Sequence, residues 1–136
     1  METMSTFDLL MGMDAKDKAV PTKKVDVKRL SKELGAKFIV TLKALPVDRF
    51  LELSQAAQSE DGTTDLKKNQ DINCIIVAEA MVDPDVRNKE LMTHFKAATP
   101  ADVVRSFLQA GEIAEMTEIV SGLCGFAKNQ VEVVKN

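Results

Sequence analysis

The sequence predicts an α+β fold, in which an N-terminal β-hairpin is followed by a bundle of four or five α-helices. Residues that favour strands cluster before residue 44, and after Pro46 the apolar residues recur at helical spacing. The length of 136 residues, of which 45% are hydrophobic, suits one globular domain. We therefore expect a single domain over residues 24–125, between a flexible N-terminal segment (1–23) and a C-terminal tail (126–136).

The hairpin is predicted from two β-rich stretches. Val25-Asp26-Val27 alternates, and Phe38 to Leu42 is rich in β-formers, which indicates strands at about 24–29 and 36–43. Gly35 lies between them and gives the chain the freedom to turn back. Phe38, Val40 and Leu42 would share one face. Because two strands alone are marginally stable, the hairpin must pack on helices or pair elsewhere.

Two longer helices are expected next. Pro46 and Asp48 suit the start of a helix at about 47–58, and the composition of 59–64 is typical of a loop. Asp65 can cap a second helix at about 66–82, which Asp83-Pro84 would end. Its wide apolar stripe predicts that this helix is the central, most buried one; the stripe comprises Ile72, Ile75, Ile76, Val77, Ala80 and Met81.

Three shorter helices complete the domain. Asn88 is a plausible cap within a helical patch at 86–95, and Thr99-Pro100 is the clearest helix start, for a helix at about 100–109. Gly111 is expected to break the helix, and a last helix is expected at about 112–124. That helix would turn Ile113, Met116, Val120 and Leu123 inward, and Glu112, Glu115 and Glu118 would form its outer face.

The composition argues against catalysis. There is no Trp, no Tyr and a single His, and aromatic residues make up only 4% of the chain. His94 has no acid or nucleophile near it in sequence, so a structural role is expected. The acidic pairs Glu60-Asp61 and Asp83/Asp85 are interpreted as turn and cap residues. We therefore predict no enzyme, no catalytic residues, no cofactor and no metal site, and we interpret Cys74 and Cys124 as free thiols.

Charge is unevenly distributed along the chain. Residues 16–37 carry a net charge of +5 and the remainder −8, which gives the total of −3. A basic segment can bind nucleic acid, but its lysines alternate with acids, which favours a solvated linker followed by a strand edge guarded by Lys. The last helix has three glutamates and no Lys or Arg, so a DNA-reading helix-turn-helix is not expected. No apolar stretch approaches the roughly 20 residues that cross a membrane, and the N-terminus does not resemble a secretory signal.

The candidate partner-binding residues lie near the N-terminus. Phe7, Leu9, Leu10, Met11 and Met13 form a short apolar cluster ahead of a polar linker. Methionine side chains adapt to irregular grooves, so the cluster is a candidate docking peptide. The alternative is a frayed terminus with one turn of helix. A groove between the hairpin and the first helix is a second candidate surface.

The order of these signals resembles the XkdN-like tail assembly chaperones of contractile-tailed phages and phage-like elements. The resemblance covers about residues 25–125, and each of its pieces is a generic fold signal, so that only their order is distinctive. The pieces are Val25-Asp26-Val27-Lys28-Arg29-Leu30-Ser31, Phe38 to Leu42, Asp71-Ile72 with the apolar run to Met81, Val82-Asp83-Pro84-Asp85, Leu91, Thr99-Pro100 and Ala110-Gly111-Glu112-Ile113.

The resemblance implies a non-enzymatic assembly factor of a phage or prophage. Such a chaperone binds the tape-measure protein, and in some cases other tail proteins, in the host cytoplasm. It is absent from the mature virion. The resemblance implies no nucleic-acid or membrane partner, and it identifies no contact residues. The alternatives are a structural tail or baseplate component that stays in the particle and, less favoured, a small DNA-binding regulator. The open edges of the hairpin leave a homo-oligomer as an option.

Overall fold

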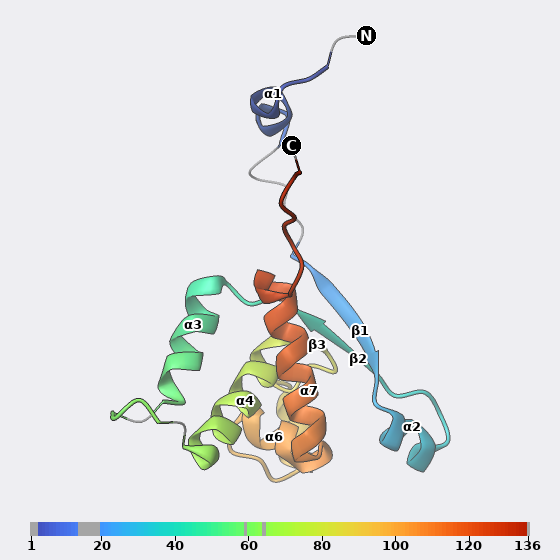
Figure 1. Ribbon diagram of the computed structural model, residues 1–136. Helices are drawn as coiled ribbons and strands as arrows, with labels where there is room; N and C mark the ends of the chain where they lie inside the picture. The colour runs from blue at the N-terminus through green and yellow to red at the C-terminus, as the bar shows by residue number, and fades with distance from the viewer. Residues whose placement is uncertain (1–2, 14–19, 59, 64, 136) are drawn as a thin grey trace.

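The predicted α+β class is confirmed. The computed structural model describes residues 3–13, 20–58, 60–63 and 65–135. A three-stranded antiparallel sheet in the order β1-β2-β3 lies beside a group of helices, two of which, α4 (Leu66–Ala80) and α7 (Ala110–Ser121), pack against its central strand (Figure 1). The sheet and the helices thus form two layers around a shared core.

The hairpin is present, with shorter strands than expected. β1 (Thr22–Asp26) pairs with β2 (Ile39–Lys43) so that Val25 lies opposite Val40. Val40 and Leu42 are fully buried and Ile39 is exposed, as the predicted alternation requires. The expected strand at 24–29 is wrong at its end, because a helix, α2 (Lys28–Leu34), replaces the simple turn. Gly35 ends this helix with φ of +70°, a left-handed conformation that glycine adopts without strain.

A third strand occupies a place where the sequence predicted helix. β3 (Met81–Asp83) pairs antiparallel with β2, so the expected helix at 66–82 ends two residues early, at Ala80. Met81 is extended and its side chain is 1% exposed, in register with Leu42. Burial of Met81 against β2 therefore outweighs continuation of the helix at this point.

Among the described residues, five α-helices follow the hairpin, within the four or five predicted. Besides α4 and α7 they are α3 (Val47–Ala56), α5 (Lys89–His94) and α6 (Pro100–Phe107). The predicted caps are confirmed, since the side chains of Asp65, Asn88 and Thr99 each accept hydrogen bonds from backbone N–H groups in the first turn. A single π-helical turn, η1 (Gly122–Phe126), extends α7.

The expected helix break at Gly111 is wrong. Gly111 lies inside the first turn of α7, and the chain leaves helical geometry at Leu108, which is extended and 6% exposed. Gln109 and Glu112 form a capping box that fixes the start of α7. The burial of Leu108 and this box, rather than the glycine, separate α6 from α7.

The core is one continuous hydrophobic cluster with α4 at its centre. This helix contacts α3, α6 and α7 and buries Cys74, Ile76, Val77, Ala78 and Ala80, which confirms its predicted central position. By contrast, the N-terminal helix α1 (Thr6–Met11) buries no residue, and Figure 1 shows it and the C-terminal tail apart from the body of the domain. The predicted linker and basic segment lie partly outside the described residues, since 14–19 are not among them.

Candidate functional site

The first candidate surface is a groove lined by apolar side chains, which we name the apolar groove. It encloses about 310 Å³ between α2, the end of β3, α5 and α6. Leu34 is 63% exposed at its rim, although it is a large apolar residue. The full lining consists of Leu30, Leu34, Phe38, Pro84, Leu91, Phe95 and Phe107.

Aromatic contacts fix the shape of the apolar groove. The ring of Phe107 meets that of Phe38 edge-on at 5.9 Å between centroids, and it stacks on that of Phe95 at 6.2 Å. Phe107 is the last residue of α6, Phe38 precedes β2 and Phe95 caps α5, so three separate elements converge on one wall. Such a groove suits the apolar face of a helix, whose i, i+3 and i+4 side chains enter together.

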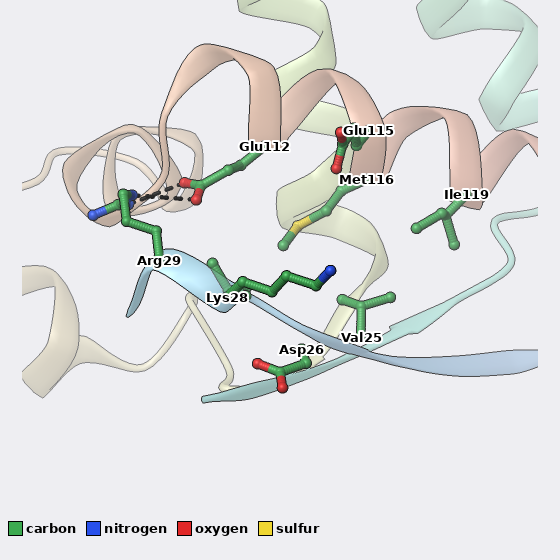
Figure 2. Close-up of a pocket in the computed structure, with 9 residues that line it drawn as sticks. Val25, Asp26, Lys28, Arg29, Glu112, Glu115, Met116 and Ile119 are labelled. Atoms are coloured by element: carbon green, nitrogen blue, oxygen red, sulfur yellow. Dashed lines mark hydrogen bonds and ion pairs between the residues drawn. The ribbon is translucent and has the colours of Figure 1, made fainter. Parts of the chain in front are cut away.

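A second groove lies between β1 and α7, and we name it the strand groove. It encloses about 290 Å³. Figure 2 shows Met116 and Ile119 of α7 directed toward β1, Ile119 on the side of Val25 and Met116 on the side of Lys28, whose side chain lies along the gap between strand and helix. Apolar atoms therefore lie at the bottom of the groove, while Asp26, Lys28 and Glu115 supply charge around them.

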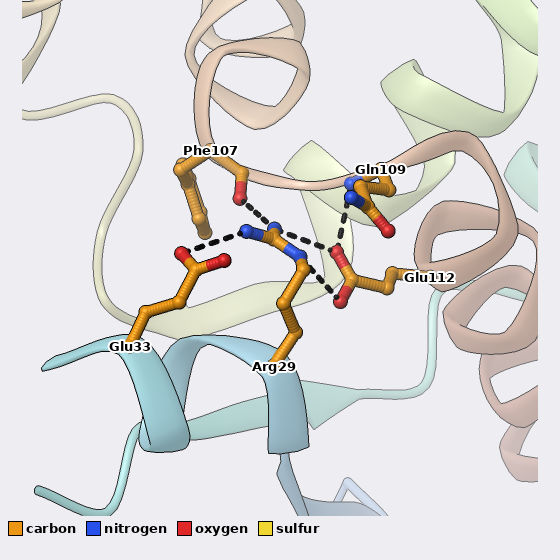
Figure 3. A network of polar contacts seen from close by, with 5 residues as sticks. All are labelled: Arg29, Glu33, Phe107, Gln109 and Glu112. Atoms are coloured by element: carbon orange, nitrogen blue, oxygen red, sulfur yellow. Dashed lines mark hydrogen bonds and ion pairs between the residues drawn. The ribbon is translucent and has the colours of Figure 1, made fainter. Parts of the chain in front are cut away.

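Arg29 connects residues that line the two grooves. Its guanidinium donates to both carboxylate oxygens of Glu112, from Nε at 3.2 Å and from Nη2 at 3.0 Å (Figure 3). Nη2 also donates to the carbonyl oxygen of Phe107 at 2.8 Å, and Nη1 to Glu33 at 3.2 Å. Arg29 and Glu112 line the strand groove and Phe107 lines the apolar groove, so this network belongs to both.

The network shifts the titration of its own members. Hydrogen bonds from Arg29 hold the pKa of the Glu112 carboxyl below its ordinary value, and the backbone N–H of Gln109 adds to this effect. In return, Glu112 raises the pKa of Arg29, which stays charged. The prediction that Glu112 lies on the outer face of its helix is wrong, because its side chain is only 20% exposed.

The five N-terminal candidate residues lie together on and beside α1. Phe7, Leu9, Leu10, Met11 and Met13 are each between 57% and 69% exposed. Ser5 and Asp8 form a capping box that starts the helix. The structure therefore presents these side chains to solvent as an accessible apolar segment, and whether they bind a partner stays a prediction.

The two grooves described above lie elsewhere on the hairpin than the expected groove beside the first long helix, which stays a prediction. Those described above are lined by α7 or by α2, α5 and α6, and α3 lines neither. Sequence reasoning missed the apolar groove because Leu30 and Leu34 were placed in a turn. Their i, i+4 spacing, together with Gly35 as a helix stop, was the signal that could have identified α2.

The residues considered for catalysis serve the fold or face solvent. Asp85 accepts from the backbone and side chain of Arg87, and Asp61 accepts from Thr63, so both carboxylates are turn residues. His94 is exposed in the last turn of α5 beside the ring of Phe95.

Charged side chains also line a wide hollow of about 490 Å³ between α4 and α6. There Arg105 pairs with Asp71 at 2.5 Å and with Asp102 at 2.9 Å, so these charges satisfy one another. The two cysteines are free, Cys74 buried in α4 and Cys124 half-buried in η1.

Two kinds of feature are absent from the residues that the structure describes. Nowhere among them do three or more His, Cys, Asp or Glu side chains gather as a metal ion requires. Nor does that part of the chain contain a helix whose length and apolar character would let it cross a bilayer.

Comparisons with known proteins give one family and one related structure. The profile of the phage XkdN-like tail assembly chaperone proteins matches residues 7–136. The crystal structure of the protein YqbN is similar to this one, with a TM-score of 0.54 and 23% sequence identity, over 93% of this chain and 99% of that chain. At this identity the similarity concerns the fold. The comparison with curated proteins finds no match.

Proposed function

Because the chain belongs to the phage XkdN-like tail assembly chaperone family, we propose that it binds the tape-measure protein during tail morphogenesis, without catalysing a reaction. The proposal includes that it acts in the host cytoplasm and leaves before the particle is complete. The chaperone role follows from the family, and the tape-measure protein as the partner is our extension of that role. The observation that carries the extension is the apolar groove, an open surface without a polar lining residue.

The chemistry of the apolar groove suits an amphipathic helix of the partner. Leu34 lies at the rim and Phe95 and Phe107 form the wall, so a helix that enters buries apolar area on both sides. The hydrophobic effect gives about 25 cal/mol for each Å² of apolar surface removed from water. A tape-measure protein rich in amphipathic helices would gain solubility from such cover until it meets its own assembly partners.

The N-terminal helix offers a second contact to the same partner. Phe7, Leu10 and Met11 follow an i, i+3, i+4 spacing, so they lie on one side of α1. All three are exposed. In this proposal α1 is a second contact with the partner, separate from the apolar groove.

Co-expression with the tape-measure protein of the same phage tests the proposal. We expect the wild-type chain to keep the partner soluble and to co-purify with it. Leu34→Glu places a charge at the rim of the apolar groove, and loss of one leucine contact predicts about a tenfold or greater fall in captured partner. Leu66→Glu is the matched control, since Leu66 is an exposed leucine, 81% accessible, at the start of α4 and outside the groove lining.

The two parts of the proposal fail in different ways. If wild type leaves the partner insoluble and uncaptured, the proposed function is wrong. If wild type captures the partner and Leu34→Glu captures as much as Leu66→Glu does, the function stands and the apolar groove is not the contact. Mass spectrometry of purified particles adds a third check, because a structural tail component is retained and a chaperone is missing.

A further inference from the structure

The outer edge of β1 offers backbone hydrogen-bonding groups on the side away from β2. Val27 N–H donates to Phe38 O, and Ala44 N–H donates to Pro21 O. The backbone N–H and C=O groups of the odd-numbered residues of β1 therefore point toward β2. In an antiparallel pair the intervening residues turn their N–H and C=O groups the other way. Thr22, Lys24 and Asp26 therefore present donors and acceptors outward, and among the described strands none lies on that side.

The strand groove runs directly beside this edge. Side chains alternate between the faces of a sheet, so a strand added to β1 places every second side chain on the face of Val25. That face looks toward α7, where Ile119 lies on the side of Val25 and Met116 on the side of Lys28 (Figure 2). An edge strand next to a helix, with an apolar floor between them, is the arrangement that takes an extended peptide by strand addition.

The chain itself carries a segment of the matching chemistry. Val131, Val133 and Val134 are 93%, 89% and 84% exposed, and β-branched residues strongly favour strands. The segment has no regular secondary structure in the single chain. Three of the four residues from Val131 to Val134 thus combine strand preference with almost complete exposure.

The base of the tail directs it away from its own strand groove. The side-chain amide of Gln130 donates to Gly125 O at 2.5 Å and to Ala127 O at 2.7 Å, and Gly125 has φ of +102°. Figure 1 shows the tail leaving beyond the start of β1, in the direction opposite to the course of that strand. To reach its own β1 edge, the tail would have to reverse its direction.

We propose that residues 131–134 of a second copy add as a strand to the outer edge of β1. Val131 and Val133 then enter the strand groove beside Val25, and Glu132 falls on the opposite face with Lys24, to which its charge is complementary. Since each copy has both a tail and an edge, the contact is reciprocal and closes as a twofold dimer. This inference does not rest on the proposed function, because it concerns only contacts between copies.

Sedimentation equilibrium of the full chain and four variants tests the dimer. Lys24→Pro removes one outward N–H but leaves the bonds from β1 to β2, and Lys24→Arg, which keeps both that N–H and the charge, is its control. Val133→Asp puts a charge on the apolar side of the tail, and Lys128→Asp, in the tail but outside the strand segment, is its control. We expect the full chain to dimerise, and both Lys24→Pro and Val133→Asp to weaken association by about tenfold or more. Both controls should stay within about twofold of wild type.

NMR identifies the occupant of the β1 edge. On raising the concentration of the full chain, we expect the amide signals of Thr22, Lys24 and Asp26 to shift, and a chain that ends at Gln130 should show no such change. Shifts that are already complete at a concentration where the chain sediments as a monomer mean that the tail binds in its own molecule, which overturns the second-copy proposal. A full chain that stays monomeric, or a truncated chain that dimerises equally well, overturns it too. Far-UV circular dichroism verifies that each variant is folded.

Discussion

Arg29 links three parts of the chain that lie far apart in sequence. It donates to Glu33 within α2, to the Phe107 carbonyl at the end of α6 and to Glu112 in the first turn of α7. Glu112 in turn accepts from the Gln109 N–H at 2.8 Å, so one carboxylate both starts α7 and holds α2. Charge-assisted, bidentate contacts of this kind are the stronger hydrogen bonds of a protein.

The first prediction concerns Glu112→Gln. Near pH 7 we expect the free energy of unfolding to fall by about 1–2 kcal/mol, because hydrogen bonds to charged groups are worth more than neutral ones. The folded-state pKa of Glu112 lies below its ordinary value, so its stabilising effect is present above the unfolded-state pKa and is lost as the pH falls through the folded-state pKa. The difference between wild type and variant should therefore shrink between about pH 6 and about pH 3.

Urea denaturation at a series of pH values measures this difference. Glu115→Gln is the matched control, because Glu115 is exposed on the same helix and should change stability by less than about 0.5 kcal/mol. A difference between wild type and Glu112→Gln that stays constant with pH would show that the ion pair with Arg29 does not carry the effect.

At the residue scale, the local signals were predictable and the distant pair was not. Asp65, Asn88 and Thr99 were identified as caps because capping depends on a few neighbouring residues. Arg29 and Glu112 lie 83 residues apart, and only the packing of α2 on α6 and α7 brings them together. For the same reason the sequence assigned Glu112 to the outer face of its helix.

Among the helices and strands, α1 stands out because it folds without burying a side chain. It has six residues, and helices shorter than about 12 residues are marginal in water without packing. Its capping box contributes to its start, but its exposed apolar residues gain nothing until they are covered. The helix therefore adds little to the stability of the domain, and its binding of a partner stays a prediction.

The second prediction is that a chain that begins at Val20 is as stable as the full chain. We expect the free energy of unfolding to change by less than about 0.5 kcal/mol, because α1 has no buried residue. Urea denaturation of both chains measures it. A loss of more than about 1 kcal/mol would instead mean that the N-terminal segment packs on the domain.

The elements that sequence reasoning missed are short and decided by tertiary contacts. β3 continues the apolar run of α4 without a break in the pattern, and only the position of β2 turns Met81 into a strand residue. The seven residues of α2 contain Leu30 and Leu34 as a helical pair, too brief a pattern to outweigh the strand signals around it. Because α2 builds one side of the apolar groove, missing the helix also meant missing the groove.

At the scale of the whole molecule, one hydrophobic cluster joins the sheet to the helices. Leu42 of β2 is fully buried and belongs to the same cluster as Ile76 of α4 and Val120 of α7. No boundary divides this core, so sheet and helices should unfold together. The predicted order of hairpin and helices was correct because strand and helix periodicity differ clearly on the two sides of Pro46.

The third prediction is that Leu42→Ala destabilises both layers equally. We expect a loss of about 2–5 kcal/mol, the usual cost of a leucine-to-alanine cavity in a core. Ile39→Ala, on the exposed face of the same strand, is the control and should cost less than about 1 kcal/mol. Far-UV circular dichroism of the helices and NMR signals of the strands should give coincident transitions; transitions at different urea concentrations would show two separately stable parts.

The rates at which the two free thiols react with a labelling reagent report how often different parts of the molecule open. Cys74 is fully buried in α4, where burial raises its pKa, so a thiol-reactive reagent reaches it only through large-scale opening. Cys124 lies half-buried in η1, where its Sγ donates to Leu45 O at 3.4 Å, at the base of the tail. Labelling rates measured in one sample therefore separate loosening of the C-terminal end from opening of the core, without any introduced probe.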